Sequence, residues 1–232
     1  DSDVVFVGYG INAPEKKWND YAGLDVKGKT VVILVNDPDW ETAGLQGEFG
    51  GQAMTYYGRW TYKFEEAARR GAIAALVVHE TQAAGYGWNV VESPGGENFN
   101  IVLPADAPQP LLLQGWIQRP VAEALLKRAG HDFEAVKRAA RTSAFKPIDL
   151  QATFRANAAV DLARITSRNV IGKLTGSSYP HETVSYAVHW DALGIGPPDD
   201  QGRTICPGAA DDALGTAAMI EIARMFASGA RP

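Results

Sequence analysis

Residues 31–35 (VVILV) and 73–78 (IAALVV) are two short apolar runs that decide the fold. Both are rich in β-branched residues and lack polar alternation, so they predict strands buried on both faces. Between them, residues 63–70 contain two Glu–Arg pairs at i,i+4 spacing, and Gly71 follows as a stop signal, which predicts a helix. A buried strand, a helix and a second buried strand predict a mixed α/β fold, a β-rich domain with flanking helices.

The same reasoning extends to both ends of the chain. A strand is expected at residues 4–7. Helices are expected from Pro120 to Gly130, over 133–141 with Asp132 as N-cap, and along the final apolar stripe at residues 218–226, which we interpret as core packing. Further strands are expected at 150–157, 169–174 and 184–189. Because the pattern changes after Pro147, we expect two domains, residues 1–146 and 147–232.

Composition excludes several classes of protein. The chain has 232 residues, 46% of them apolar, which is enough for at least one core. Its 22 basic and 27 acidic residues form no dense basic block, which argues against a nucleic-acid partner. The single cysteine, Cys206, excludes an intramolecular disulfide and a cysteine-built zinc site. No apolar run approaches the roughly 20 residues of a membrane helix.

A glycine-rich turn near the start superficially matches a dinucleotide-binding motif. Residues 8–13 (GYGINA) follow the strand at 4–7 in a loose G-x-G-x-x-A pattern, and Asp37 follows the next strand. Such a site requires a helix that starts at the second glycine. Pro14 and a turn-like segment come next instead, so the pattern indicates a strand-to-loop turn.

The strongest chemical candidate lies in the last quarter of the chain. A predicted strand delivers His189-Trp190-Asp191, and residues 207–215 (PGAADDALG) open the final helix. In His-x-Asp the two side chains leave a strand in the same direction, so Asp191 can hold the second imidazole nitrogen of His189. Asp211 stands at the start of a helix, where a carboxylate can bridge two cations. These residues could form half of a metal site.

Structural roles explain the same residues. Asp211 or its neighbour Asp212 could cap the final helix, and His189 could be a satisfied core histidine. The remaining three histidines lack readable partners and are interpreted as structural or surface residues: His79, His131 and His181.

The motifs around His189 and residues 208–215 resemble the M28 metallopeptidases, co-catalytic two-zinc aminopeptidases and carboxypeptidases. Residues 6–38 and 63–78 look like the protease-associated (PA) domain that many of these enzymes carry as an insertion. The resemblance implies a PA domain with connecting helices at 1–146, and the incomplete N-terminal part of a peptidase domain at 147–232.

The resemblance also implies roles for individual residues. His189 would be a terminal ligand of one zinc ion and Asp211 would bridge the two zinc ions. Asp191 would be the active-site acid that orients His189, and the Asp211–Asp212 peptide bond would be cis. The family pattern further needs a Glu-Glu pair, another acid and a final histidine downstream, which implies that this chain is a fragment.

The implied function is metal-dependent removal of N-terminal residues from a peptide substrate by a periplasmic or secreted enzyme, with this chain alone inactive. The alternative is a non-catalytic homologue in which the PA domain mediates interaction, as in receptors.

Overall fold

The computed structural model describes residues 1–92, 99–104, 106–107, 109–192, 194–196 and 198–229. The chain divides into two compact units, Asp1–Val160 and Asp161–Pro232, and each is described by itself.

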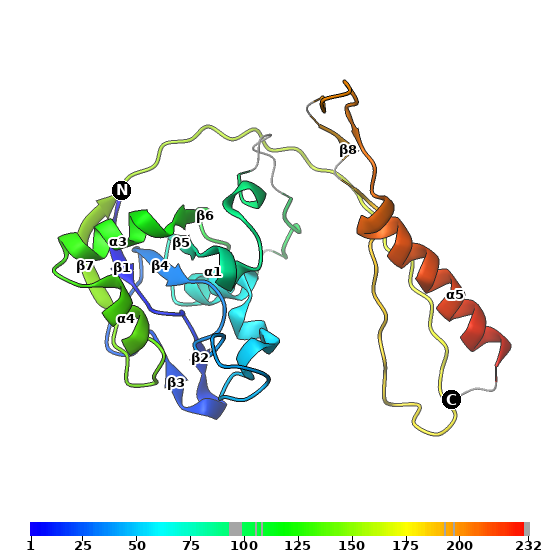
Figure 1. Cartoon of the computed structure of the whole chain (residues 1–232), viewed down its shortest axis with the longest axis horizontal. Helices are drawn as coiled ribbons and strands as arrows, with labels where there is room; N and C mark the ends of the chain where they lie inside the picture. The colour runs from blue at the N-terminus through cyan, green and yellow to red at the C-terminus, as the bar shows by residue number, and fades with distance from the viewer. Residues whose placement is uncertain (93–98, 105, 108, 193, 197, 230–232) are drawn as a thin grey trace. The chain divides into compact units, whose positions relative to one another are not determined.

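A five-stranded sheet forms the centre of the first unit (Figure 1). Its spatial order is β6-β5-β4-β1-β7. β1 pairs with β4, β4 with β5 and β5 with β6 in parallel, whereas β7 pairs antiparallel with β1. The strands are β1 (Ser2–Phe6), β4 (Thr30–Leu34), β5 (Ala74–His79), β6 (Leu113–Gln118) and β7 (Ile148–Phe154). The predicted α/β class is confirmed.

Helices cover both faces of this sheet. On one face, residues such as Phe6 and Leu76 pack with Leu126 and Val136, which come from α3 (Arg119–Arg128) and α4 (Phe133–Ala139). On the other, Val77 packs with residues of α1 (Trp60–Arg69) and of the short α2 (Thr81–Ala84). Adjacent strand residues point to opposite faces, so strands with helices on both sides are apolar throughout.

The helices of the first unit agree with their sequence signals. α1 ends just before Gly71, which has a φ of +78°. The expected pairs of Glu66 with Arg70 and Glu65 with Arg69 form at 2.8 and 3.8 Å. The strand β6 was not predicted, because its sequence LQGWIQ mixes polar and apolar residues without a clear period.

Asp132 caps α4 as predicted, since its Oδ1 accepts a hydrogen bond from the Ala135 N–H at 2.8 Å. Replacing Asp132 with Ala is expected to lower the free energy of unfolding by about 1 kcal/mol, because the N–H loses its acceptor. Chemical denaturation of the full chain measures the difference. Asp132→Asn keeps an acceptor and is the matched control, so an equal loss in both variants would contradict the capping role.

The glycine-rich turn after β1 does not lead into a helix. Gly8 and Gly10 have φ of +58° and +63°, which glycine adopts without strain. The chain then forms β2 (Asn12–Ala13), which pairs with β3 (Trp18–Asn19). The described residues of the unit also form short 3-10 turns: η1 (Pro14–Lys16), η2 (Gly51–Ala53), η3 (Tyr56–Gly58) and η4 (Trp88–Val90). The helix start that a dinucleotide site requires is therefore missing at Gly10.

A lysine lies fully buried in the first unit. The ammonium group of Lys63 donates to the carbonyl oxygens of Tyr9 at 2.6 Å and Asn36 at 3.0 Å. Burial lowers the pKa of Lys63, while the carboxylates of Asp37 and Asp20 counteract that effect. Burial also raises the pKa of Asp20. This internal charge cluster connects α1 to the segments that follow β1 and β4.

The boundary between the units differs from the one expected at residues 146/147. The strand predicted at 150–157 forms as β7, but it pairs with β1, with Ser2 opposite Phe154. β7 therefore completes the first sheet, and the compact unit continues to Val160. The assignment of the two parts as a PA domain and a peptidase domain stays a prediction.

The second unit contains little regular structure apart from one helix. β8 (Gly194–Ile195) pairs with β9 (Ile205–Cys206), and a kinked turn, η5 (Ala209–Ala213), leads into α5 (Leu214–Ser228). The predicted strands at 169–174 and 184–189 do not form, because the described residues provide no ladder partner for them.

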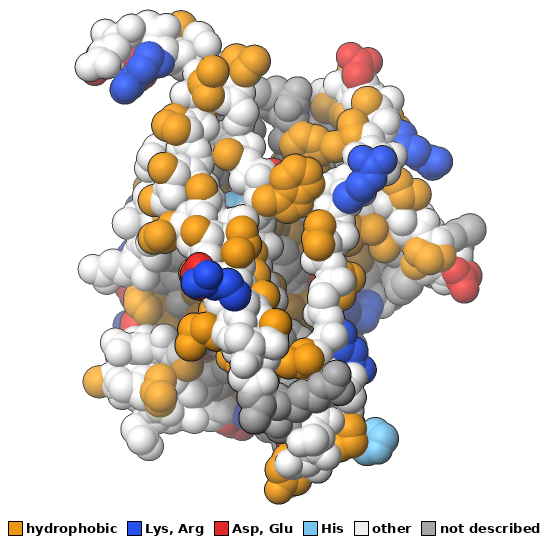
Figure 2. Space-filling view, turned by 90° about the vertical axis from the view of Figure 1, so that its right-hand side faces the viewer, with side chains coloured by type: hydrophobic (Ala, Val, Ile, Leu, Met, Phe, Trp, Pro, Cys, Tyr) orange, Lys and Arg blue, Asp and Glu red, His pale blue; other side chains and the backbone are white. Residues whose placement is uncertain are grey.

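Apolar side chains of the second unit are exposed. Val170 and Val184 are 95% and 80% exposed, and no residue of α5 is buried. Figure 2 shows many hydrophobic side chains on the surface that faces the viewer. The interpretation of the α5 stripe as core packing is therefore wrong for this structure.

Candidate metal centre

The predicted site residues His189, Asp191 and Asp211 converge in the second unit. His189 and Asp191 belong to an extended segment, whereas Asp211 lies in η5, one turn before α5. His189 Nε2 lies 2.9 Å from Asp211 Oδ1, and His189 Nδ1 lies 3.1 Å from Asp191 Oδ1. The two carboxylates thus face opposite nitrogens of one imidazole ring.

The carboxylates and a carbonyl group favour the protonated imidazole. The backbone oxygen of Asp191 lies 3.2 Å from Nδ1 and is the largest cause of a raised pKa for His189. The side chains of Asp191 and Asp211 act in the same direction. A metal would require a neutral ring with a free Nε2. The contact between Nε2 and Asp211 is therefore the one that a metal ion would replace.

The sequence suggested Asp212 only as a possible helix cap, and its contact with the His189 backbone was missed. Its Oδ2 accepts from the His189 backbone N–H at 3.3 Å, and its Oδ1 accepts from the Gly215 N–H at 3.1 Å. Thr216 Oγ1 donates to the His189 carbonyl oxygen at 3.1 Å. Asp212 in η5 and Thr216 in the first turn of α5 thereby hold the backbone of His189 on both sides. Of the two acids suggested as caps, Asp212 accepts from a first-turn N–H of α5, that of Gly215.

Two local features shape this turn. The Asp211–Asp212 peptide bond is cis, as the resemblance implied. A Cβ atom on Gly215 would lie 2.0 Å from Asp212 Oδ1, so glycine at this position leaves space for the Asp212 carboxylate. The spacing D-D-x-x-G is therefore explained by a contact between its second and last residues.

The donor types fit zinc, but their number is small. Imidazole nitrogen and carboxylate oxygen are ordinary zinc ligands, and Asp191 is placed to orient the ring. Asp191 binds the nitrogen opposite to Asp211, so the three residues do not face one point. Among the described residues, no group of three or more His, Cys, Asp or Glu side chains could hold a metal ion.

The other three histidines lie away from these residues in the sequence and have different contacts. His79 is buried, with Nε2 3.0 Å from the carbonyl oxygen of Tyr86. His131 and His181 are exposed.

Comparison with known proteins identifies one family. Residues 169–232 match the family model of peptidase family M28, a match that includes His189, Asp191 and Asp211 and covers less than a third of the chain. Searches of curated proteins and of solved structures gave no match. None of the helices in the described part of the chain has the length and apolar character of a membrane-spanning segment.

Proposed function

We propose that this chain contributes His189 and Asp211 to the two-zinc centre of an M28-type aminopeptidase, which removes N-terminal residues from peptides. The observation that supports the proposal is the 2.9 Å approach of His189 Nε2 to Asp211 Oδ1, inside the segment that matches the family. We also propose, from the family resemblance, that the first unit is a PA domain and that the enzyme acts in the periplasm or outside the cell.

Each residue has a defined task in this proposal. Asp191 accepts a hydrogen bond from the Nδ1–H group of His189, which would leave the Nε2 lone pair for a metal. Asp211 would offer its carboxylate group as a ligand to the metals. Asp212 and Thr216 hold the His189 backbone against α5. When bound, zinc polarises the substrate carbonyl and lowers the pKa of a water molecule.

Zinc binding tests the assignment directly. We expect weak, saturable zinc binding by the full chain, measured by competition with a chromophoric chelator. His189→Ala and Asp211→Asn should each lower the affinity by at least about ten-fold, because each removes one ligand. Asp191→Asn should lower it by about 10–100-fold through loss of the orienting carboxylate.

His181→Ala is the matched control, because His181 is exposed and belongs to the same unit. Its zinc affinity should equal that of the unchanged chain. If His181→Ala weakens binding as much as His189→Ala, the binding is unspecific and the assignment fails.

We expect no aminopeptidase turnover by the 232-residue chain, even with added zinc. A catalytic zinc usually has three protein ligands and a water, and the described residues supply two ligands for two metals. A missing general base would cost a further 10²–10⁴-fold, roughly. Hydrolysis of amino-acid anilides, with and without a chelator, measures this. Chelator-sensitive turnover would contradict the site assignment.

A chain extended through a Glu-Glu pair and a final histidine separates the proposal from its rival. Turnover in the extended chain supports the aminopeptidase. Absence of turnover there favours a non-catalytic, PA-type interaction protein.

A further inference from the structure

A pocket of about 500 Å³ lies in the first unit, outside the segment matched to M28. It opens where β5 and β6 end, since His79 and Gln118 are the last residues of these strands. In α/β sheets, ligands bind outside the carboxyl ends of parallel strands. The volume falls within the roughly 300–1,000 Å³ typical of small-molecule sites.

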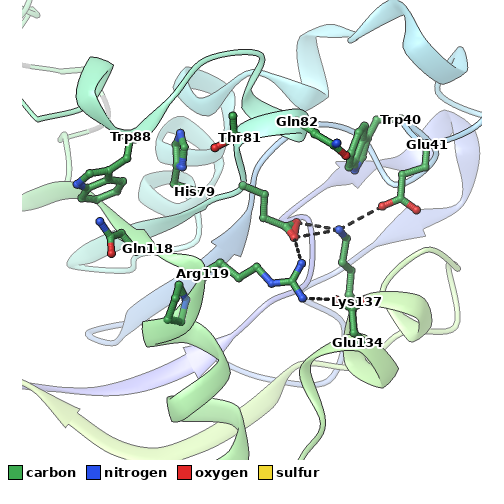
Figure 3. Close-up of a pocket in the computed structure, with 12 residues that line it drawn as sticks. Trp40, Glu41, His79, Thr81, Gln82, Trp88, Gln118, Arg119, Glu134 and Lys137 are labelled. Atoms are coloured by element: carbon green, nitrogen blue, oxygen red, sulfur yellow. Dashed lines mark hydrogen bonds and ion pairs between the residues drawn. The ribbon is translucent and has the colours of Figure 1, made fainter.

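Charged side chains from separate elements meet in this pocket (Figure 3). Glu80, which follows β5, lies 2.8 Å from the Lys137 ammonium group and 3.1 Å from the Arg119 guanidinium group. Lys137 also lies 3.2 Å from Glu41. The side chains of Glu80 and Lys137 are only 11% and 9% exposed, so this pair is largely withdrawn from water.

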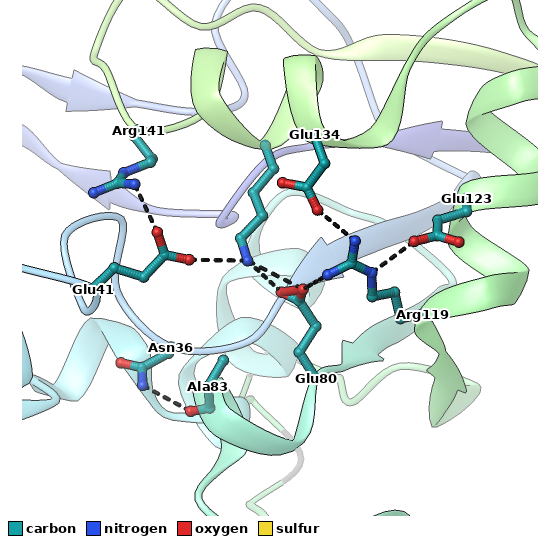
Figure 4. A network of polar contacts seen from close by, with 9 residues as sticks. Asn36, Glu41, Glu80, Ala83, Arg119, Glu123, Glu134 and Arg141 are labelled. Carbon is teal, nitrogen blue, oxygen red and sulfur yellow. Dashed lines mark hydrogen bonds and ion pairs between the residues drawn. The ribbon is translucent and has the colours of Figure 1, made fainter.

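Arg119 and Lys137 already form ion pairs with carboxylates (Figure 4). The three nitrogens of Arg119 contact three different acids, namely Glu123 through Nε, Glu80 through Nη1 and Glu134 through Nη2. Lys137 lies between Glu41 and Glu80. A ligand that brings an anion would have to displace one of these carboxylates.

The carboxylates, in contrast, have acceptor capacity to spare. An ionised carboxylate offers about four lone-pair sites. Among the described residues, Glu134 accepts an ion-pair contact through Oε1 only, and its side chain is 49% exposed. The Glu41 side chain is 40% exposed. The network combines four carboxylates with three cations, which leaves one negative charge in excess: Glu41, Glu80, Glu123 and Glu134 against Arg119, Lys137 and Arg141.

The walls of the pocket favour the same kind of ligand. Trp40 and Trp88 line it, and indole faces attract cations and pack against alkyl chains. The Lys137 ammonium group already lies 5.4 Å from the centre of the Trp40 ring. His79 Nε2 must donate to the carbonyl oxygen of Tyr86, so in the neutral ring Nδ1 is an acceptor. The pocket therefore combines acceptor groups with aromatic surface, of which the Trp40 ring already contacts one ammonium group.

We propose that this pocket binds an alkylammonium or alkylguanidinium group, such as a lysine or arginine side chain, between the Trp40 and Trp88 indoles and the Glu41 and Glu134 carboxylates. This proposal does not depend on the proposed peptidase, because its residues all belong to the first unit.

Ligand titrations test the proposal when they are followed by NMR through the indole N–H signals of the six tryptophans. Trp40→Phe and Trp88→Phe assign two of these signals. Nα-acetyl-lysine methylamide should produce saturable shifts of both signals in the millimolar range. The norleucine analogue, which has the same alkyl chain without the charge, should bind at least about ten-fold more weakly. n-Butylammonium has the alkylammonium group without the amino-acid backbone. Comparing it with the lysine derivative separates recognition of a free amine from recognition of an amino-acid residue.

Charge-removing variants locate the binding groups. Glu41→Gln and Glu134→Gln should each weaken lysine binding by about three- to ten-fold. Glu48→Gln removes an exposed carboxylate outside the pocket and should have no effect. Equal binding of norleucine, stronger binding of glutarate, or no saturable shift with any probe would each overturn the proposal and leave the network a purely structural one.

Discussion

Replacing Lys63 with Met is expected to lower the free energy of unfolding by about 3–5 kcal/mol. The ammonium group is the hydrogen-bond donor to the carbonyl oxygens of Tyr9 and Asn36, and Met supplies no donor. The substitution also leaves Asp20 and Asp37 without their buried counter-charge. Met has nearly the same length as Lys, so the loss reports the polar contacts and not a cavity.

Denaturant unfolding of the full chain, followed by far-UV circular dichroism, measures this loss. Lys127→Met is the matched control, because Lys127 is exposed at the end of α3 and its replacement should change stability by no more than about 0.5 kcal/mol. If Lys63→Met loses less than about 1 kcal/mol, the buried cluster contributes little to stability and this account of it is wrong.

Periodicity and composition predicted the parts of the fold that depend on burial. β4 and β5 are buried at every position because helices cover both faces of the sheet, and their residues are apolar except for Thr30 and His79 at the strand ends. This pattern is readable in one strand alone. The place of β7 was not readable in this way. Its partner β1 is almost the whole first unit away in sequence, and pairing across such a distance leaves no local signal.

The strands expected at 169–174 and 184–189 had a local signal in the sequence but do not form. Alternating apolar residues express a preference for extended backbone, but a strand also needs a neighbour to accept and donate its ladder hydrogen bonds. Among the described residues of the second unit, only β8 and β9 pair with each other.

The proximity of His189, Asp191 and Asp211 was predictable from the two motifs that contain them, whereas their role as a metal site stays a prediction. His189 and Asp191 are two residues apart, and the two motifs together suggested the approach to Asp211. The contact of Asp212 with the His189 backbone was missed, because a carboxylate that accepts backbone N–H groups leaves no distinctive spacing. The network around Glu80 was missed for the same reason, since Glu80 and Lys137 are 57 positions apart.

Nearly all of the unfolding free energy is expected to come from the first unit. Its core has two complete apolar layers, with residues such as Val5, Ile33 and Val77 fully buried. In the second unit, no residue of α5 is buried, and an isolated helix of about 15 residues is only marginally stable in water.

Hydrogen exchange of the full chain, followed by mass spectrometry, separates the two units. Amides of β1, β4 and β5 should exchange only through global unfolding, whereas those of residues 161–229 should exchange nearly as fast as in an unfolded peptide. A chain that ends at Val160 should unfold at the same denaturant concentration as the full chain, within about 0.5 kcal/mol.

Strong protection of α5 in the 232-residue chain would contradict this expectation, because burial within the described second unit does not account for it. Repeating the exchange experiment with added zinc tests whether metal binding orders the second unit. A ligand that binds only the ordered form stabilises that form by a free energy that grows with the logarithm of one plus its concentration over its dissociation constant. If His189 and Asp211 share a metal ion, zinc should slow exchange in the first turn of α5, and His189→Ala should abolish that effect without changing protection of β4 and β5.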